Sequence, residues 1–347
     1  MKRRSLIFAA PERVEVCAEE FDGPAAGELL VQARLSAISS GTELLAFRGQ
    51  IPQEMSLDAG ISALSGSFRF PFKYGYACLG EVVDIGPGVD PAWRGRRVFA
   101  FHPHESAFTA APGDVIPVPA DIADEDALFL ANMETAVNFV QDGRPLLGES
   151  VAVMGCGIVG LLTTALLARF PLAALVAFDR IPRRRKAALA AGALLSFDPQ
   201  VPESTQQARQ WLSEHGSPEG ADLVYEISGS PAALQQALDL AGFGARVVIG
   251  SWYGKKPVTL DLGGSFHRSR VQLIASQVST LAPELSGRWT KARRLDAAWD
   301  ALRQVGPKRW ITQTFDFGDA PQAYELLAER SAEAIQVVLR YADDFAG

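Results

Sequence analysis

The chain has 347 residues, more than a single hydrophobic core usually holds, so two domains are expected. Its apolar fraction of 48% and charged fraction of 21% are ordinary for a folded globular protein and argue against a disordered chain. The net charge of −7 argues against a nucleic-acid partner, because phosphate-binding surfaces carry a basic excess, and the one basic run, residues 180–186, is short.

The cysteine content and the apolar runs indicate the cellular compartment of the protein. Only three cysteines occur and none forms a CxxC pair, so neither a disulfide framework nor a thiolate zinc site is expected, and a reducing cytoplasm fits. No apolar run approaches the roughly 20 residues that cross a bilayer. We therefore expect a cytoplasmic protein without membrane contact.

Residues 1–120 consist of short apolar and β-branched runs between Gly, Pro and Asp clusters, which predicts a mostly β domain. Residues 50–75 lack a clear period and predict a long loop near a cleft. Four aromatic residues alternate at its end, at Phe68, Phe70, Phe72 and Tyr74. They indicate either a cleft wall for a bulky or planar substrate or ordinary core packing.

The pattern changes near residue 123, where helical spacing begins. Apolar strand-like runs then alternate with helical stretches, and the runs lie near residues 151–155, 174–179, 222–228 and 246–251. Such alternation is typical of βαβ units around a buried parallel sheet. The sequence therefore predicts an α/β fold with a second, β-rich domain.

A glycine-rich turn follows the first of these strands. It comprises Gly155, Gly157 and Gly160, with Ile158 and Val159 opening the next helix. In dinucleotide-binding folds this spacing allows a tight turn, close approach of a pyrophosphate and helix packing, and the helix N-terminus supplies amide donors. The alternative is a glycine turn that serves packing alone.

The residue that follows the next strand strengthens the cofactor interpretation. Asp179 lies where a carboxylate would accept hydrogen bonds from the adenosine ribose, which favours NAD. Arg180, Arg183 and Arg184 follow and could instead pair with the 2′-phosphate of NADP. For Arg185 and Lys186 a solvated helical turn is the better interpretation. NAD is expected, with NADP possible.

Four segments then occur in the order of a known superfamily. They are GEVVDIGPGV at 80–89, RGRRVFAF at 94–101, DLVYEISGSPAALQQAL at 222–238 and RVVIGSWYG at 246–254. The chain thus resembles the medium-chain dehydrogenase/reductase (alcohol dehydrogenase-like) superfamily. The resemblance implies a GroES-like β-rich catalytic domain at 1–132 and 277–347, and a Rossmann doubly wound parallel-sheet domain at 133–276.

The resemblance also implies further cofactor contacts and a homodimer formed through the edge of the Rossmann sheet. The implied contacts are Thr135, Ser228, Gly229, Gly250, Ser251 and, beside the nicotinamide, Ser276, Gln277 and Val278.

The chain departs from the zinc-dependent members at the ligand positions. Their Cys-Gly-Thr-Asp turn matches Ser40-Gly41-Thr42-Glu43, and their Gly-His-Glu stretch matches Gly75-Tyr76-Ala77. A neutral serine is a poor zinc ligand. Near the third position lie Ala131 and Asn132, and the cysteines of the structural zinc lobe are also absent. No metal is expected, although His102 and His104 could bind one in place of a loop or substrate-contact role.

Without a Lewis acid, the oxygen that becomes negative during hydride transfer needs hydrogen-bond donors. The catalytic candidates are Ser40, Thr42 and Tyr76, and Tyr76 could act as an acid if its pKa is lowered. The alternatives are core packing for Tyr76 and turn capping for Thr42.

The predicted function is a zinc-independent NAD(P)-dependent oxidoreductase that transfers a hydride between nicotinamide and a small-molecule alcohol or ketone. One alternative is a reductase of activated C=C bonds or quinones. Another is a cofactor-binding protein without turnover.

Overall fold

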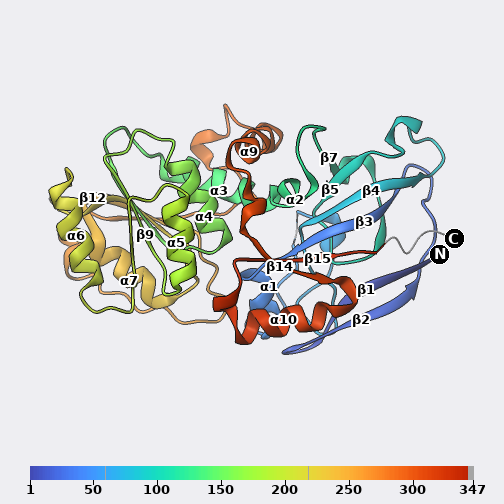
Figure 1. Ribbon diagram of the computed structural model, residues 1–347, viewed down its shortest axis with the longest axis horizontal. Coiled ribbons are helices and arrows are strands. Elements are labelled where there is room, and N and C mark those ends of the chain that lie inside the picture. The colour runs from blue at the N-terminus through green and yellow to red at the C-terminus, as the bar shows by residue number, and fades with distance from the viewer. Residues whose placement is uncertain (59, 218, 343–347) are drawn as a thin grey trace. The chain divides into compact units, whose positions relative to one another are not determined.

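The computed structural model describes residues 1–58, 60–217 and 219–342 (Figure 1). The chain divides into two compact units. The β-rich unit comprises Met1–Ala131 with Gly306–Gly347, and the parallel-sheet unit comprises Asn132–Val305.

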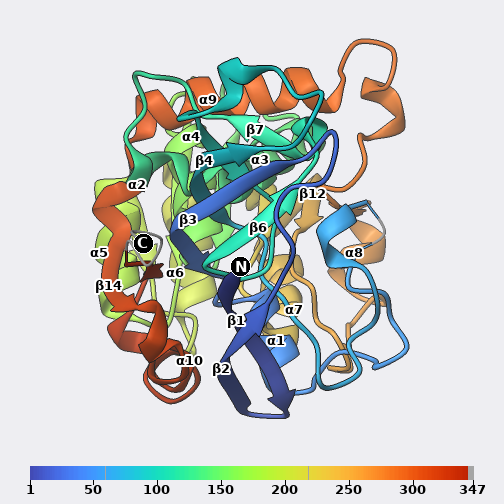
Figure 2. The same cartoon turned by 90° about the vertical axis from the view of Figure 1, so that its right-hand side faces the viewer.

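The β-rich unit contains a hairpin and a larger mixed sheet. The larger sheet has the order β14-β15-β3-β4-β5-β7, with β6 also paired to β3, and β1 and β2 form a separate two-stranded sheet. Its elements are β1 Lys2–Ala10, β2 Arg13–Glu20, β3 Leu29–Ile38, α1 Thr42–Phe47, β4 Cys78–Ile85, β5 Arg97–Ala100, β6 Ala107–Ala110, β7 Val115–Pro117, α2 Asp124–Ala127, β14 Ile311–Asp316, α10 Ala320–Glu329 and β15 Gln336–Arg340. Helix α10 packs against β2 and α1, as both ribbon views show (Figures 1 and 2).

The alternating aromatic residues at 68–74 belong to the core of this unit. Phe68, Phe72 and Tyr74 are buried, and the Phe72 ring stacks on Phe8 with centroids 5.0 Å apart. Phe70 is partly buried and packs against the same core. Of the two sequence-based interpretations, core packing describes these side chains, since burial leaves them little surface for a substrate.

The parallel-sheet unit is a doubly wound sheet. Its six strands are parallel in the order β10-β9-β8-β11-β12-β13, so strands numbered by appearance run 3-2-1-4-5-6. This is the Rossmann order. The elements are α3 Leu130–Gly143, β8 Ser150–Met154, α4 Ile158–Leu167, β9 Ala174–Phe178, α5 Pro182–Ala190, β10 Leu195–Phe197, α6 Ser204–Glu214, β11 Ala221–Glu226, α7 Pro231–Leu240, β12 Ala241–Ile249, α8 Ser265–Arg268, β13 Gln272–Ala275 and α9 Lys291–Val305.

Both faces of this sheet are covered, which explains why its strands are apolar throughout. Ala152 and Met154 of β8 pack in one cluster with α6 and α7. Val151 and Val153, on the opposite face, pack with Phe139 of α3 and Leu167 of α4. Strand β8 has no position that faces water, so it reads as a continuous apolar run.

The segment 277–305 lies in the parallel-sheet unit, whereas the sequence places the return to the first domain at 277. The difference has a physical cause in helix α9. This helix contacts α4, and its buried Arg294 binds side chains of α3. Helix α9 therefore packs against helices of the Rossmann fold and belongs to that unit.

The predicted fold class is confirmed: a β-rich domain is combined with a Rossmann parallel-sheet domain. Within the described residues, no helix has the length and apolar character needed to span a membrane.

Candidate active site

The glycine-rich turn lies between β8 and α4, at the carboxyl end of the sheet. Gly155 has φ +101°, and a Cβ there would lie 2.6 Å from the Ser228 backbone. A Cβ on Gly160 would lie 1.9 Å from the Gly155 carbonyl oxygen. At Gly157, by contrast, a Cβ would meet nothing within 4 Å. Two glycines thus serve close packing, while the middle one leaves the backbone open to a pyrophosphate at the helix N-terminus.

Asp179 follows β9 and is buried beside this turn. One carboxylate oxygen accepts the Cys156 N–H and the other the Ile181 N–H, both at 2.8 Å. Each carboxylate oxygen has a second lone pair for an incoming donor. Asp179 therefore holds the glycine turn in shape and retains acceptor capacity for ribose hydroxyls.

The arginines after Asp179 differ in their surroundings. Arg180 is exposed, whereas Arg184 is partly buried and burial lowers its pKa. Arg185 donates to the Asp179 carbonyl at 2.7 Å and to Asp198 at 3.0 Å. Arg185 is thus part of the turn's framework rather than a solvated side chain, because its two acceptors fix it to the loops after β9 and β10.

The loops after β11 and β12 meet around a buried carboxylate, Glu226. Its side chain accepts the Ser228 N–H at 2.9 Å and also the hydroxyl of Tyr253. The Gly229 N–H donates to the Ser251 hydroxyl at 2.8 Å, and the Gly250 N–H donates to the Glu226 carbonyl at 2.9 Å. The predicted contacts Ser228, Gly229, Gly250 and Ser251 therefore form one hydrogen-bonded edge, which Glu226 organises.

The segment after β13 carries the remaining predicted contacts. Ser276 donates to Asp142 of α3 and accepts from Asn138 at 2.9 Å. The Val278 carbonyl accepts from Arg294, and Gln277 is exposed. Thr135 is partly buried on α3, whose side chains bind this segment.

In the β-rich unit, the three catalytic candidates lie close to one another. Thr42 opens α1, Ser40 lies in the turn before it, and Tyr76 follows the aromatic segment. The side chains of Ser39 and Thr42 lie near the Tyr76 hydroxyl and favour its ionised form, which by itself lowers the pKa of Tyr76. The Thr42 N–H also donates to the Ser39 hydroxyl at 3.3 Å. The result is a cluster of hydroxyl groups, which we call the hydroxyl cluster: Ser39, Thr42 and Tyr76.

Burial and the Glu43 carboxylate raise the pKa of Tyr76 to about 12. The condition set from the sequence, a lowered pKa, is therefore not met. The reason is physical: an apolar setting and a nearby negative charge both disfavour the phenolate. Tyr76 stays protonated at neutral pH and is a hydrogen-bond donor.

A second, fully buried network lies next to the hydroxyl cluster. Glu43 accepts the Ser39 N–H at 2.8 Å, His104 Nε2 lies 2.9 Å from it, and the Tyr324 hydroxyl also bonds to it. The other His104 nitrogen lies 2.7 Å from the Ser36 hydroxyl. Glu43 thus fixes the Ser39 turn, and His104 has its ring nitrogens engaged inside the fold.

His102 is also turned inward. Its ring stacks on Phe108 with centroids 3.7 Å apart, and Nδ1 lies 3.1 Å from the Pro103 carbonyl oxygen. Burial lowers the pKa of His102 to about 4, although Glu105 opposes this. His102 is therefore neutral at pH 7 and packs as an aromatic ring.

This lowered pKa predicts acid sensitivity. As pH falls from about 6.5 to 4, unfolded His102 takes up a proton before the folded form does, so stability present above pH 6.5 is lost. The size of this pKa shift limits the folding free energy lost through His102 to roughly 3 kcal/mol. Denaturant unfolding at pH 7 and 4.5 should show a smaller acid loss for His102→Phe, which keeps the stacked ring. An equal acid loss in both proteins would contradict this role.

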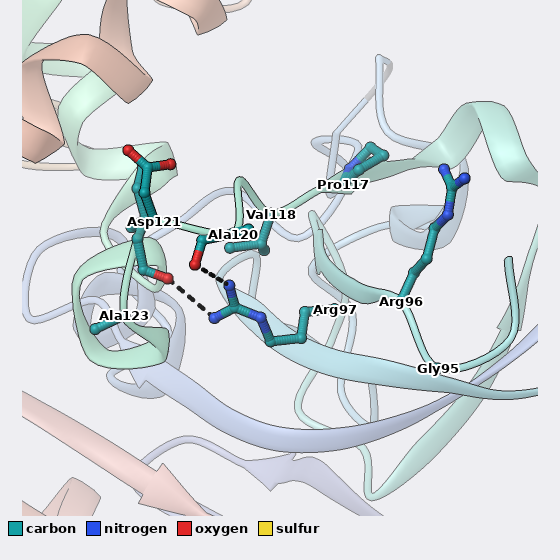
Figure 3. A pocket seen from close by; sticks show the side chains of 9 residues that line it. Gly95, Arg96, Arg97, Pro117, Val118, Ala120, Asp121 and Ala123 are labelled. Carbon is teal, nitrogen blue, oxygen red and sulfur yellow. Dashed lines mark hydrogen bonds between the residues drawn. The ribbon is translucent and has the colours of Figure 1, made fainter. Parts of the chain in front are cut away.

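A surface pocket of about 720 Å³ lies elsewhere in the β-rich unit, between β5 and the segment 117–123 (Figure 3). Its wall includes Arg97, which donates to the carbonyls of Ala120 and Ile122 and to Asp124. The Arg97 guanidinium is thus engaged by carbonyl groups of the pocket wall and by Asp124. The pocket contains none of the predicted site residues.

Among the residues that the structure describes, no group of three or more His, Cys, Asp or Glu side chains is arranged to hold a metal ion. At the positions that match the family's zinc ligands stand Ser40 and Tyr76, both hydroxyl donors.

Comparison with known proteins agrees with this architecture. Residues 159–295 match the family described as zinc-binding dehydrogenase. D-guloside 3-dehydrogenase of Escherichia coli K12 is 21% identical, over 95% of this chain and 97% of its own. The rspB alcohol dehydrogenase of Escherichia coli CFT073, solved with NADH, has a TM-score of 0.78 at 20% identity, covering 98% and 99% of the two chains. A protein of Sinorhizobium meliloti 1021, solved with NADP, also has a TM-score of 0.78, at 17% identity and 98% and 99% coverage.

The described residues form a Rossmann parallel-sheet unit that carries a glycine-rich turn, and a separate β-rich unit, and solved dehydrogenases share this fold. The chain is thus similar to zinc-binding dehydrogenases over residues 159–295 and, at about 20% identity, to dehydrogenases over nearly its whole length. The family match covers residues 159–295 and so does not include the positions that correspond to zinc ligands.

Proposed function

We propose that this NAD(P)-dependent dehydrogenase works without zinc and transfers a hydride between nicotinamide and an alcohol or ketone. The observation that carries the proposal is the hydroxyl cluster, in which Tyr76 stands at a position that matches a zinc ligand of the family. Serine and tyrosine hydroxyls are poor partners for zinc at neutral pH, but they are good donors to an oxygen that is becoming negative.

The residues support defined roles. The nicotinamide, when bound, supplies or accepts the hydride. Tyr76, protonated because its pKa is raised to about 12, donates a hydrogen bond to the substrate oxygen, and Thr42 shares that hydrogen-bonded cluster. Glu43 holds the Ser39 turn and keeps Tyr76 in its neutral form. Ser40 is a further candidate in the same turn.

The residues of the parallel-sheet unit fit a dinucleotide. Gly157 leaves room for a pyrophosphate, and Asp179 has acceptor capacity for the ribose. We include Ile158, Val159, Gly155 and Gly160 in this site through the turn they build. The similar structures solved with NADH and with NADP support a nicotinamide cofactor. We propose that residues 179–184 determine whether NAD or NADP is preferred.

The test is a substrate survey with the purified protein. Alcohols, ketones, activated alkenes and quinones are offered with NAD(H) and NADP(H), and cofactor absorbance is followed. Turnover of alcohols or ketones supports the proposal. Turnover confined to alkenes or quinones would replace it with the reductase alternative, and bound cofactor that no substrate oxidises or reduces would indicate a binding protein.

Cofactor preference should depend on the exposed Arg180. Asp179 repels a 2′-phosphate, so we expect NADH to bind more tightly than NADPH. Arg180→Gln should leave the NADH dissociation constant within about twofold and weaken NADPH binding about 10-fold, because one exposed ion pair is lost. Fluorescence titration with both cofactors measures this. Equal weakening of both would show that Arg180 supports the loop rather than the phosphate.

We also propose a homodimer and a cytoplasmic location. Strand β13 is the last strand of its sheet, and edge strands offer unpaired backbone groups to a second chain. A monomer in sedimentation equilibrium at micromolar concentration would exclude the dimer. All three cysteines are free, which suits a reducing compartment.

A further inference from the structure

Arg294 of helix α9 is fully buried, and its guanidinium is satisfied on every side. Two of its nitrogens donate to Glu134 of α3, at 3.0 and 2.8 Å, and a third donates to the Asn138 side chain at 2.7 Å. The same group also donates to the backbone carbonyls of Val278 and Thr280, the latter at 3.1 Å. One side chain thus connects two helices to the loop after β13.

The start of this loop is attached to the same helix. The Ser276 hydroxyl donates to Asp142, and Asn138 donates to both Ser276 and Asp142 at 2.9 Å. Glu134, Asn138 and Asp142 are four residues apart on α3, so they form one polar stripe along the helix. The loop 276–280 is therefore held at both ends against this stripe.

The position of the loop indicates what it would contact. All six strands are parallel, so the loops that follow them meet at one edge of the sheet. Along that edge Asp179 follows β9, the glycine turn follows β8, Ser228 follows β11 and Ser276 follows β13. A dinucleotide lies across the switch point between β8 and β11, so with its ribose at Asp179 its other end reaches the loops after β12 and β13.

We propose that Arg294 is a positioning residue for the nicotinamide half of the cofactor. A buried ion pair with Glu134 alone would stabilise only the packing of α9 on α3. The additional bonds to the Val278 and Thr280 carbonyls fix the backbone of the loop at the nicotinamide end. The inference rests on the proposed cofactor site and adds a residue to it that does not itself touch the cofactor.

The test separates the two halves of the dinucleotide. ADP-ribose carries the adenosine and pyrophosphate but no nicotinamide, so it reports on the rest of the site. Lysine at position 294 keeps the charge beside Glu134 but lacks the planar fork that reaches both helices and the loop. For Arg294→Lys we expect ADP-ribose affinity within twofold of the parent and NADH affinity at least about 10-fold weaker.

Arg293→Lys is the matched control. Arg293 is exposed and lies over the Trp289 ring, so neither ligand should change its affinity by more than twofold. If Arg294→Lys does not fold, as judged by circular dichroism, the double variant Glu134→Gln/Arg294→Met carries the same test, because it leaves no unpaired buried charge.

Equal weakening of NADH and ADP-ribose, or no weakening of either, overturns the positioning role while the proposed cofactor site stands. If the parent protein binds neither ligand, the cofactor site itself is wrong and the role of Arg294 falls with it. Selective loss of NADH affinity supports both.

Discussion

Replacing Tyr76 with phenylalanine should lower kcat for carbonyl reduction about 10²- to 10³-fold, the usual effect of removing one donor to a developing oxyanion. The NADH dissociation constant should stay within twofold, because Tyr76 belongs to the β-rich unit and the cofactor motif to the other. The ring remains and packs as before, so only the hydroxyl is lost. Steady-state kinetics with a substrate from the survey, together with NADH titration, measures both quantities.

Tyr74→Phe is the matched control. Tyr74 is buried and its ring lies 6.4 Å from that of Tyr76, so the same hydroxyl is deleted two residues away, outside the hydroxyl cluster. It should keep kcat within about threefold, as a substitution remote from the reacting atoms does. Tyr76→Phe with parental kcat would show that Tyr76 only fills the space of the missing ligand.

The second large effect concerns two glycines of one motif. Gly157→Val should keep the fold but weaken NADH binding at least about 10-fold, since its side chain enters the open space that the pyrophosphate needs. Gly160→Val should instead destabilise the protein by about 1–3 kcal/mol or more, because its Cβ would lie 1.9 Å from the Gly155 carbonyl. Denaturant unfolding and NADH titration distinguish the two effects.

Unchanged NADH affinity in Gly157→Val would mean that the turn serves packing alone. ADP titration of the same variant provides an internal check. Because ADP also carries a pyrophosphate, its affinity should fall by about the same factor as that of NADH.

Much of the parallel-sheet unit could be predicted because its physics is local. Strand β8 is buried on both faces, so the apolar run at 151–154 indicates it directly, and Gly155, Gly157 and Gly160 follow at the spacing that the turn requires. The resemblance to a superfamily then predicted which parts of the chain form the β-rich domain and which form the Rossmann domain. The boundary near residue 277 was harder, because no local pattern shows that α9 packs on α4.

The polar networks could not be predicted, since they join residues far apart in the chain. Glu43 is hydrogen-bonded to His104, 61 residues away in the sequence, and to Tyr324, 281 residues away. The pKa of Tyr76 depends on that burial and on Glu43, which explains why the sequence could not give its direction.

Arg294 did leave a signal in the sequence. It shares a helical stripe with Ala298, Ala301, Leu302 and Val305, all of them buried, so a charged residue occupies an apolar position. A cation at such a position indicates a buried partner, which proves to be Glu134, 160 residues earlier. The sequence alone could not have named that partner.

The central claim, dehydrogenase chemistry without zinc, is tested most directly by measuring zinc by elemental analysis in active protein purified without chelators. The same preparation is titrated with NADH and assayed for turnover. We expect less than about 0.1 zinc per chain, together with NADH binding and turnover that survive dialysis against a chelator. Near one zinc per chain, with turnover lost on chelation, would contradict that claim.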